Sequence, residues 1–234
     1  MLVIPTYNER ENVPGLVERI RKNLGGIPIF FVDDSSPDGT AEAIRRLQEN
    51  DDNIHLLMRA GKLGLGSAYR EAFRKIMRER LADYVITLDA DLSHPPEVLP
   101  HLTEKIKKFP VVVGSRYISG GDVQNWNRWR QLISQSGNIY ARLLTGVPVS
   151  DLTSGLVAYQ VEALRKVNLD RMTSDGYAFQ IEMKCLLHHS NIQIHEHPIT
   201  FVERREGKSK FSTPIILEGF SYPARVFVKR IFKL

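Results

Sequence analysis

The sequence predicts an α/β protein with a mostly parallel central sheet flanked by helices. Short, almost continuously apolar runs, typical of strands covered on both faces, lie at 2–5, 29–32, 54–58, 84–88 and 111–113. Between them, apolar residues recur at helical spacing, first in Val13, Leu16, Val17, Ile20 and Leu24. Strands that alternate with helices in this way form parallel sheets with right-handed crossovers.

Turn and cap residues mark the borders of these elements. Asn12 and Pro14 begin the first helix, and the pair Gly25-Gly26 ends it. The same apolar spacing predicts further helices at 41–47, 68–81 and 98–109.

Two carboxylates stand where the strand at 84–88 should end. Asp89 and Asp91 repel each other at this spacing unless a cation lies between them. Ligands of open α/β sheets bind beyond the carboxyl ends of the strands, and a divalent ion held by carboxylates commonly binds diphosphates. The sequence therefore predicts a metal and nucleotide site here, with a solvated turn as the alternative.

A glycine-rich segment at 61–67 leads into the helix at 68–81. Helix N-termini preceded by glycines attract phosphates, and Lys62 could reach a nucleotide there. The spacing differs from the Walker pattern, so a tight structural turn explains the glycines at least as well.

Composition limits the classes of partner and compartment. The 234 residues, 42% of them hydrophobic, suffice for one sizeable core. The net charge of +5 suits an anionic partner such as nucleic acid, a phosphorylated substrate or an acidic membrane face. The single Cys185 excludes a disulfide framework and favours a reducing compartment. No transmembrane run or signal peptide is apparent, and the short first strand suggests further residues upstream.

The second half of the chain is amphipathic and basic. The stretches 126–144, with Trp126 and Trp129, and 213–234 are interpreted as helices that pack on the core or lie in a membrane interface. The tail is the stronger membrane candidate because it has no obvious core left to cover. Other expected elements are a strand at 156–159, a helix that begins near 174 and an extended segment at 192–201.

Two smaller candidates carry less weight. His195 and His197 would share one strand face, but no third metal ligand is near in sequence. Cys185 lies in mid-helix among apolar neighbours, which disfavours a nucleophile.

An ordered set of motifs resembles the inverting family 2 glycosyltransferases, and within them the dolichol-phosphate (polyprenol-phosphate) mannose synthases. The motifs cover most of the chain and comprise Pro5–Glu9, Val32–Thr40, Leu88–His94, Gly114–Tyr117, Asp151–Gly155, Ser174–Gln180 and the group Arg204, Gly207, Ser209 and Lys210. The resemblance implies a GT-A (Rossmann-like) fold with a C-terminal amphipathic helix. It also implies inverting transfer of mannose from GDP-mannose to dolichyl or polyprenyl phosphate with Mg²⁺ or Mn²⁺.

The resemblance also assigns roles to individual residues. Guanosine would bind at Pro5, Tyr7, Glu9, Val32 and Asp34, and the donor's sugar-diphosphate side at Asp89, Ala90 and Asp91. Asp89 and Asp91 would hold the metal, and catalysis would rest on Asp91 and Arg116. Phosphate contacts would come from Arg116, Arg130, Ser134, Arg204 and Lys210, the last two on the donor. Some members have a glutamine metal ligand where this chain has Ser93, so water could replace it.

The residue chemistry agrees with this reaction. A phosphate monoester is already ionised at neutral pH, so such an acceptor needs no general base, and no catalytic histidine is evident. Metal and arginines would bring two anions together. The alternatives are an aspartate-nucleophile phosphatase at Asp89, a nucleotide-binding scaffold, and a sister synthase that loads glucose or an amino sugar onto the same lipid.

The expected organisation follows from these motifs. Residues 1–211 would form the catalytic domain, with a nucleotide-binding half at 1–115 and an acceptor half at 116–211, and 212–234 would be an amphipathic extension. The lipid acceptor implies a cytoplasmic protein at the cytoplasmic face of the endoplasmic reticulum or plasma membrane. The membrane surface or a small membrane-anchoring subunit would hold it there.

Overall fold

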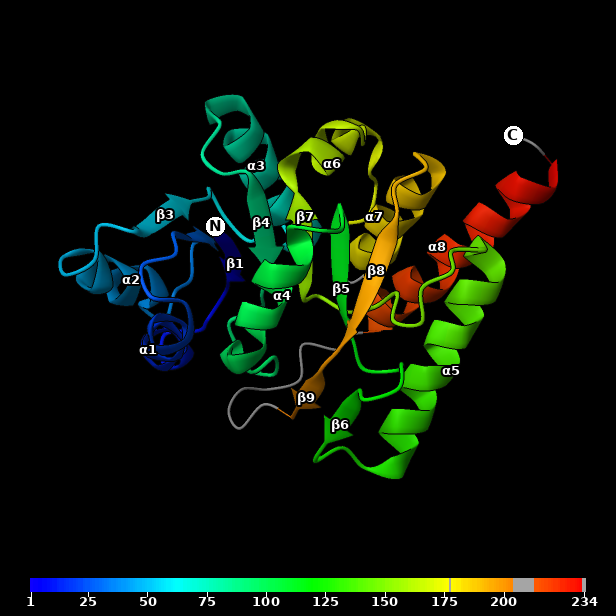
Figure 1. Cartoon of the computed structure of the whole chain (residues 1–234), viewed down its shortest axis with the longest axis horizontal. Coiled ribbons are helices and arrows are strands. Elements are labelled where there is room, and N and C mark those ends of the chain that lie inside the picture. The colour runs from blue at the N-terminus through cyan, green and yellow to red at the C-terminus, as the bar shows by residue number, and fades with distance from the viewer. Residues whose placement is uncertain (177, 204–212, 233–234) are drawn as a thin grey trace.

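The computed structural model describes residues 1–176, 178–203 and 213–232, and a seven-stranded sheet forms its centre (Figure 1). The strand order is β3-β2-β1-β4-β7-β5-β8. These strands are β1 Leu2–Thr6, β2 Ile29–Asp33, β3 Ile54–Met58, β4 Tyr84–Thr87, β5 Val111–Ser115, β7 Val157–Gln160 and β8 Ile194–Pro198. All neighbours pair in parallel except β7, which is antiparallel to both β4 and β5. The predicted mostly parallel α/β sheet is confirmed.

Helices cover both faces of this sheet. One face packs against α1 Asn12–Leu24, α2 Thr40–Gln48 and α4 Leu99–Ile106, which a 3₁₀ turn at Pro96–Val98 precedes. The other face packs against α3 Leu65–Glu79, α6 Val161–Arg165 and α7 Ala178–His189, and a further 3₁₀ turn lies at Leu169–Arg171. The aromatic rings of Tyr69, Phe73 and Phe179 stack inside this second layer. Burial of both sheet faces explains why the strands are continuously apolar in sequence.

The insertion of β7 between β4 and β5 determines which residues meet. Because β7 is antiparallel to both neighbours, β4 and β5 run in the same direction. The carboxyl ends of β1, β2, β4 and β5 therefore lie at one edge of the sheet, which gathers the segments after Thr6, Asp33, Thr87 and Ser115.

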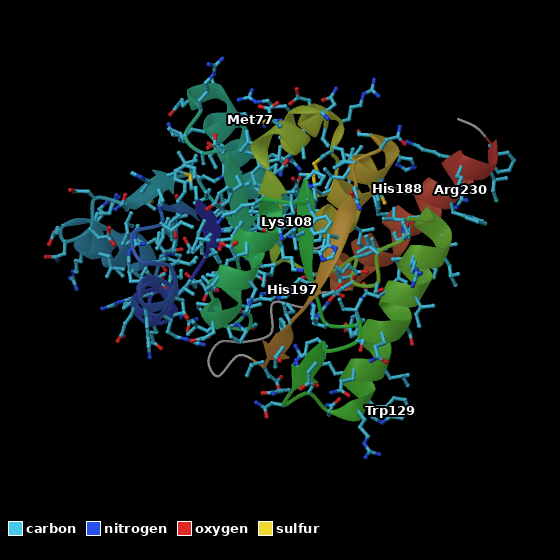
Figure 2. All side chains as sticks on the ribbon, in the orientation of Figure 1. Met77, Lys108, Trp129, His188, His197 and Arg230 are labelled. Carbon is cyan, nitrogen blue, oxygen red and sulfur yellow. The ribbon has the colours of Figure 1, made fainter. Side chains whose placement is uncertain are left out.

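The helix predicted at 126–144 is α5, Arg128–Thr145, and the prediction was wrong about its start. Asn127 is the N-cap, and its side chain accepts a hydrogen bond from the backbone N–H of Arg130 at 2.8 Å. Trp126 therefore lies before the helix and packs edge-on against Phe201. Trp129 is 74% exposed and points away from the body of the protein (Figure 2). Phe201 belongs to a small parallel sheet of β6 Asp122–Gln124 and β9 Thr200–Val202.

The tail forms α8, Thr213–Phe232, which lies beside α5 and also contacts α7 (Figure 1). The expectation that it has no core left to cover was wrong, because Tyr222 packs on a buried cluster of Ala141, Val147, Val149, Leu152, Ile181 and Cys185. Within the described ranges, no helix is both long and apolar enough to cross a membrane. The division at 115/116 and the extension at 212–234 stay predictions.

Candidate active site

The candidate site lies at the sheet edge where the carboxyl ends of β1, β2, β4 and β5 meet. This is the usual ligand edge of an open α/β sheet. Pro5 pairs with Val32 in the register of β1 and β2. The Nζ of Lys62 lies 4.3 Å from the centre of the Tyr7 ring, so the glycine-rich segment approaches the same end of the edge. Glu9 is buried and accepts a hydrogen bond from the Asn12 side chain at 2.7 Å.

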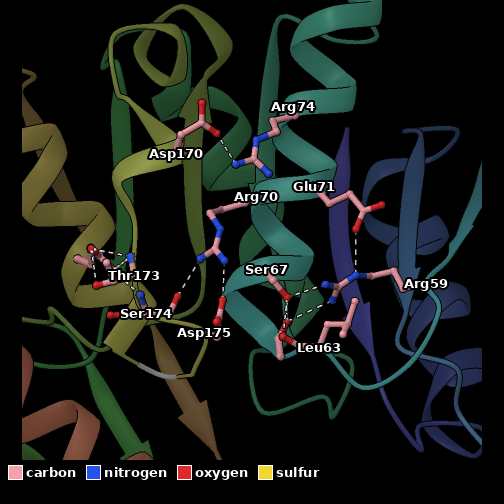
Figure 3. Close-up of polar contacts among 12 residues, drawn as sticks. Arg59, Leu63, Ser67, Arg70, Glu71, Arg74, Asp170, Thr173, Ser174 and Asp175 are labelled. Atoms are coloured by element: carbon pink, nitrogen blue, oxygen red, sulfur yellow. Dashed lines mark hydrogen bonds and ion pairs between the residues drawn. The ribbon is translucent and has the colours of Figure 1, made fainter.

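Asp34 anchors the glycine-rich segment. Its Oδ2 accepts the backbone N–H groups of Leu63 at 3.0 Å and Gly64 at 3.1 Å, and its Oδ1 pairs with Arg59 at 2.5 Å. Arg59 also donates to Ser67 (Figure 3). Two backbone N–H groups of the glycine-rich segment thus bind a carboxylate of the protein itself. This supports the interpretation of the segment as a tight structural turn over that of a phosphate-binding loop.

The glycines also allow close packing. A Cβ on Gly66 would lie 2.4 Å from the carbonyl oxygen of Ser174, and one on Gly64 would lie 2.8 Å from that of Asp175. Arg70 of α3 fixes the same segment by donating to the Ser174 carbonyl and the Asp175 carboxylate (Figure 3).

Asp89 and Asp91 follow β4, as predicted. The Asp91 Oδ1 accepts the backbone N–H of Ser93 at 3.1 Å, across a Leu92 with a φ of 60°. Ala90 is buried between them. In the described residues, no three His, Cys, Asp or Glu side chains form a ready metal cage. Two carboxylates are nevertheless enough when diphosphate oxygens and waters complete the shell.

His94 is a neighbour of this pair that the sequence did not reveal. It is 2% exposed, its Nδ1 makes no hydrogen bond within the described residues, and that atom lies 3.8 Å from the Asp89 Oδ2. Burial lowers the pKa of His94 to about 4 although Asp91 opposes the shift. The imidazole is therefore neutral at physiological pH. Ser93, the position of the family's glutamine, is buried as well.

Arg116 follows β5 and is held by Asp151. Its Nε and Nη2 each donate to the Asp151 carboxylate at 2.7 Å, and Nη2 also donates to the Thr153 hydroxyl at 2.8 Å. Burial opposes both charges, but their mutual attraction lowers the pKa of Asp151 and raises that of Arg116. Nη1 makes no hydrogen bond to the described residues, so one prong of the guanidinium fork is available to an anion.

Arg130 and Ser134 lie on α5 and reach the same region. Arg130 forms an ion pair with Glu203 and stacks on the Trp126 ring at 4.3 Å. Ser134 accepts a hydrogen bond from the Tyr117 hydroxyl at 2.6 Å. The guanidinium of Arg116 lies 5.9 Å from the same Trp126 ring. Trp126 thus links two of the predicted phosphate ligands.

A cavity of about 460 Å³ opens beside Arg116, between α5 and the loop after β5. Its lining combines polar and aliphatic side chains: Arg116, Tyr117, Ile118, Gly121, Gln135, Asn138, Ile139, Arg142 and Ser150. Such a lining suits a ligand with an anionic head and an apolar body.

Other predicted residues lie outside the described part or away from this edge. Arg204 and Lys210 fall outside the described residues. His195 stacks on Phe109 with the ring centres 4.0 Å apart, and His197 faces His101. Burial raises the pKa of the Cys185 thiol to about 12, which disfavours a nucleophilic role.

A sheet of this order, with acidic residues after its central strand, is the GT-A fold of glycosyltransferases, and solved structures share it. The TM-score is 0.64 to a glucosyl-3-phosphoglycerate synthase of Mycobacterium tuberculosis solved with UDP, at 17% identity over 95% of this chain and 79% of that one. The TM-score to a mannosyltransferase of Pyrobaculum calidifontis solved with GDP-Man and Mn²⁺ is 0.62, at 18% identity over 96% of this chain and 63% of that one. The predicted fold class is confirmed.

The chain belongs to glycosyl transferase family 2, whose sequence model matches residues 1–167. It is 41% identical to an undecaprenyl-phosphate mannosyltransferase of Micrococcus luteus, over 94% of this chain and 90% of the relative. It is also 41% identical to a polyprenol monophosphomannose synthase of Mycolicibacterium smegmatis, over 94% and 83%. The resemblance inferred from the motifs is confirmed.

Proposed function

We propose that this glycosyltransferase moves mannose from GDP-mannose to a polyprenyl phosphate, with inversion and with a divalent cation. Two relatives at 41% identity carry the names of polyprenol-phosphate mannosyltransferases. The observation that carries the proposal is the meeting of an acidic pair, Asp89 and Asp91, with the buried Arg116 at one sheet edge. Such a site suits two anionic substrates, one of them bound through a metal.

Asp89 and Asp91 would hold Mg²⁺ or Mn²⁺. Gly155 lies against Asp89, where a Cβ would come within 3.2 Å of the carboxylate, so the absent side chain leaves room for a ligand of that carboxylate. The space left by the glycine and the two carboxylates, which offer only oxygen ligands, fit a divalent cation. When bound, the cation would supply charge stabilisation for the departing diphosphate.

The donor would lie along the edge from β2 to β4. Its guanosine is assigned to Pro5, Tyr7, Glu9, Val32 and Asp34, its mannosyl-diphosphate side to Asp89, Ala90 and Asp91, and its phosphates also to Arg204 and Lys210. In this assignment Asp34 acts mainly through the turn it anchors, because both of its oxygens already have partners.

The acceptor phosphate would bind at Arg116, Arg130 and Ser134. The monoester has a second pKa of about 6, so it arrives ionised and needs no base. Arg116 would bind an oxygen through Nη1 and orient it for in-line attack at the anomeric carbon. Attack from the face opposite the diphosphate inverts that centre. The first prenyl units would occupy the cavity beside Ile118 and Ile139.

The protein would meet the lipid at a membrane interface through the α5–α8 surface. We define this surface by its exposed apolar residues, which are Trp129, Leu132, Ile133, Ile139, Leu143, Phe220, Phe227, Val228, Ile231 and Phe232. Exposed basic residues flank it, namely Arg128, Arg142, Arg225, Lys229 and Arg230. Apolar and basic side chains together suit an anionic bilayer surface.

The test is transfer with a panel of nucleotide sugars. Purified protein, a short polyprenyl phosphate and Mn²⁺ are incubated with GDP-mannose, UDP-glucose or UDP-N-acetylglucosamine, and the lipid product is identified by mass spectrometry. We expect product from GDP-mannose alone, with a β-mannosyl linkage by NMR. Product from UDP-glucose instead would establish the sister synthase, and an α-linkage would contradict inversion.

A further inference from the structure

The loop 150–155 touches both halves of the candidate site. At one end, Asp151 holds the guanidinium of Arg116. At the other end, Gly155 lies against the Asp89 carboxylate. The backbone course of this loop therefore decides how Arg116 and Asp89 stand relative to each other.

Two polar side chains, one an acceptor and one a donor, hold the backbone of this loop. Glu196 of β8 accepts the N–H groups of Ser150 at 2.9 Å and Asp151 at 3.1 Å. Lys184 of α7 donates through Nζ to the carbonyl oxygens of Leu152 at 3.1 Å and Ser154 at 2.9 Å. The loop is thereby fixed at four backbone groups, two N–H groups and two carbonyls, which suits a segment that must not shift.

Ser154 carries this restraint to β5. Its hydroxyl donates to the carbonyl oxygen of Gly114 at 2.6 Å, two residues before Arg116. The path from Lys184 to Arg116 thus runs both through Asp151 and through the strand itself.

Lys184 is an unusual residue for this position. It is fully buried, and in the described part of the chain it makes no ion pair; its third bond goes to the carbonyl of Gln180 in its own helix. Lysines are almost never fully buried without a partner charge, because losing hydration is costly. A Met or Leu would fill the space without that cost, so the N–H donors of Nζ are the feature that distinguishes this side chain.

We propose that Lys184 is a positioning residue for the transfer reaction. It holds the loop 150–155 and thereby keeps Arg116 and Asp89 in the relative positions that the two substrates require. Because it is fully buried, it would act through the loop and not by contact with substrate or metal, and its role rests on the proposed function. The charged groups around it are Asp151, Arg116 and Glu196.

The first test is Lys184→Met, which keeps the length of the side chain and removes its donors. We expect kcat to fall at least about 10-fold, the usual effect of losing a positioning contact, whereas KM for GDP-mannose stays within about two-fold. Lys184→Gln, which retains a donor, should recover part of kcat. Phe73→Leu, in the core away from the loop, is the control. We expect it to lower Tm about as much as Lys184→Met does, but to leave kcat unchanged. An unchanged kcat in folded Lys184→Met would overturn the proposal.

A double-mutant cycle separates positioning from general stability. If Lys184 acts through Arg116, adding Lys184→Met to Arg116→Lys should cost little further kcat, whereas independent effects multiply. Multiplying losses would overturn the proposal. If Lys184→Met does not fold, Lys184→Gln is the gentler change at the same position, and the same cycle applies.

A readout without turnover keeps this inference separate from the proposed function. In the wild type, the Arg116 Nε–H should give a slowly exchanging ¹⁵N-NMR signal because it is bonded to Asp151 and buried. We expect faster exchange in Lys184→Met and no change in Phe73→Leu. An unchanged signal would refute the positioning role, even if the wild type transfers no mannose.

Discussion

Asp151 accepts three hydrogen bonds from one residue, Arg116, at 2.7 Å from Nε, 2.7 Å from Nη2 and 3.0 Å from the backbone N–H. The residues are 35 positions apart, and both side chains are buried. The pair fixes a cation at the sheet edge opposite Asp89 and Asp91, and several consequences can be measured.

Asp151→Asn should destabilise the fold strongly. The substitution leaves the guanidinium of Arg116 buried without its counter-ion, which typically costs about 3–5 kcal/mol. Urea unfolding measures the loss. Glu71→Gln is the matched control, because Glu71 pairs with Arg59 but its side chain is 48% exposed, and exposed pairs are worth about 0–1 kcal/mol. Equal losses in the two variants would contradict this account of the buried pair.

Arg130→Gln should weaken use of the acceptor while the fold survives. Losing a charge-assisted hydrogen bond costs about 1.5–3 kcal/mol, or roughly 10- to 150-fold in kcat/KM for the polyprenyl phosphate. Steady-state kinetics at saturating GDP-mannose provide the measurement. Arg128→Gln, on the exposed side of the same turn, is the control, and an effect of similar size there would remove Arg130 from the phosphate site.

Asp91→Ala should abolish transfer and Mn²⁺ binding together. Two carboxylates are the protein's share of the proposed metal shell, and one is not expected to hold the ion. Activity with added Mn²⁺ and calorimetric titration of Mn²⁺ in the presence of GDP measure the two effects. The exposed Asp170→Ala is the control. Full turnover of the wild type in excess EDTA would rule out metal dependence.

The Cys185 thiol should resist alkylation in the folded protein. Burial raises its pKa to about 12, above the usual 9.0, so the reactive thiolate stays scarce until the pH approaches 12. The same shift makes the free energy of unfolding depend on pH. The unfolded chain loses this proton near pH 9.0, so the contribution of the thiol to stability is present below that pH and declines as the pH rises toward 12. Mass spectrometry after iodoacetamide treatment at pH 8, with and without urea, tests it; rapid labelling without urea would contradict the burial.

The α5–α8 surface should bind anionic vesicles in a salt-sensitive way. Each basic residue near such a surface adds about 1 kcal/mol, and apolar side chains add the rest. Ile133→Glu and Ile231→Glu should each weaken flotation with vesicles, whereas Leu63→Glu, an exposed apolar residue outside α5 and α8, should not. Deleting 221–234 is a poorer test, because Tyr222 packs on the buried cluster. Flotation unaffected by both substitutions would exclude this surface as the anchor.

Periodicity and composition predicted the α/β sheet, the strand that precedes Asp89 and the low reactivity of the lone thiol. These are local properties. A strand buried on both faces needs a continuous apolar run, and the position of a carboxylate directly after that run can be read from the sequence without knowing which residues it contacts. The motifs also identified the family, which the comparisons confirmed. The role of each site residue stays a prediction.

Tertiary structure alone decided which distant residues meet. No spacing in the sequence reveals that β7 inserts between β4 and β5, that Asp151 pairs with Arg116, or that Lys184 holds the loop between them. Periodicity also placed Trp126 in a helix that begins after it, and it left α8 without a core. The physical reason is that helical and strand periods report which face of an element is apolar. The partner that covers this face, and the buried charges that must be paired beneath it, depend on the packing of the whole chain.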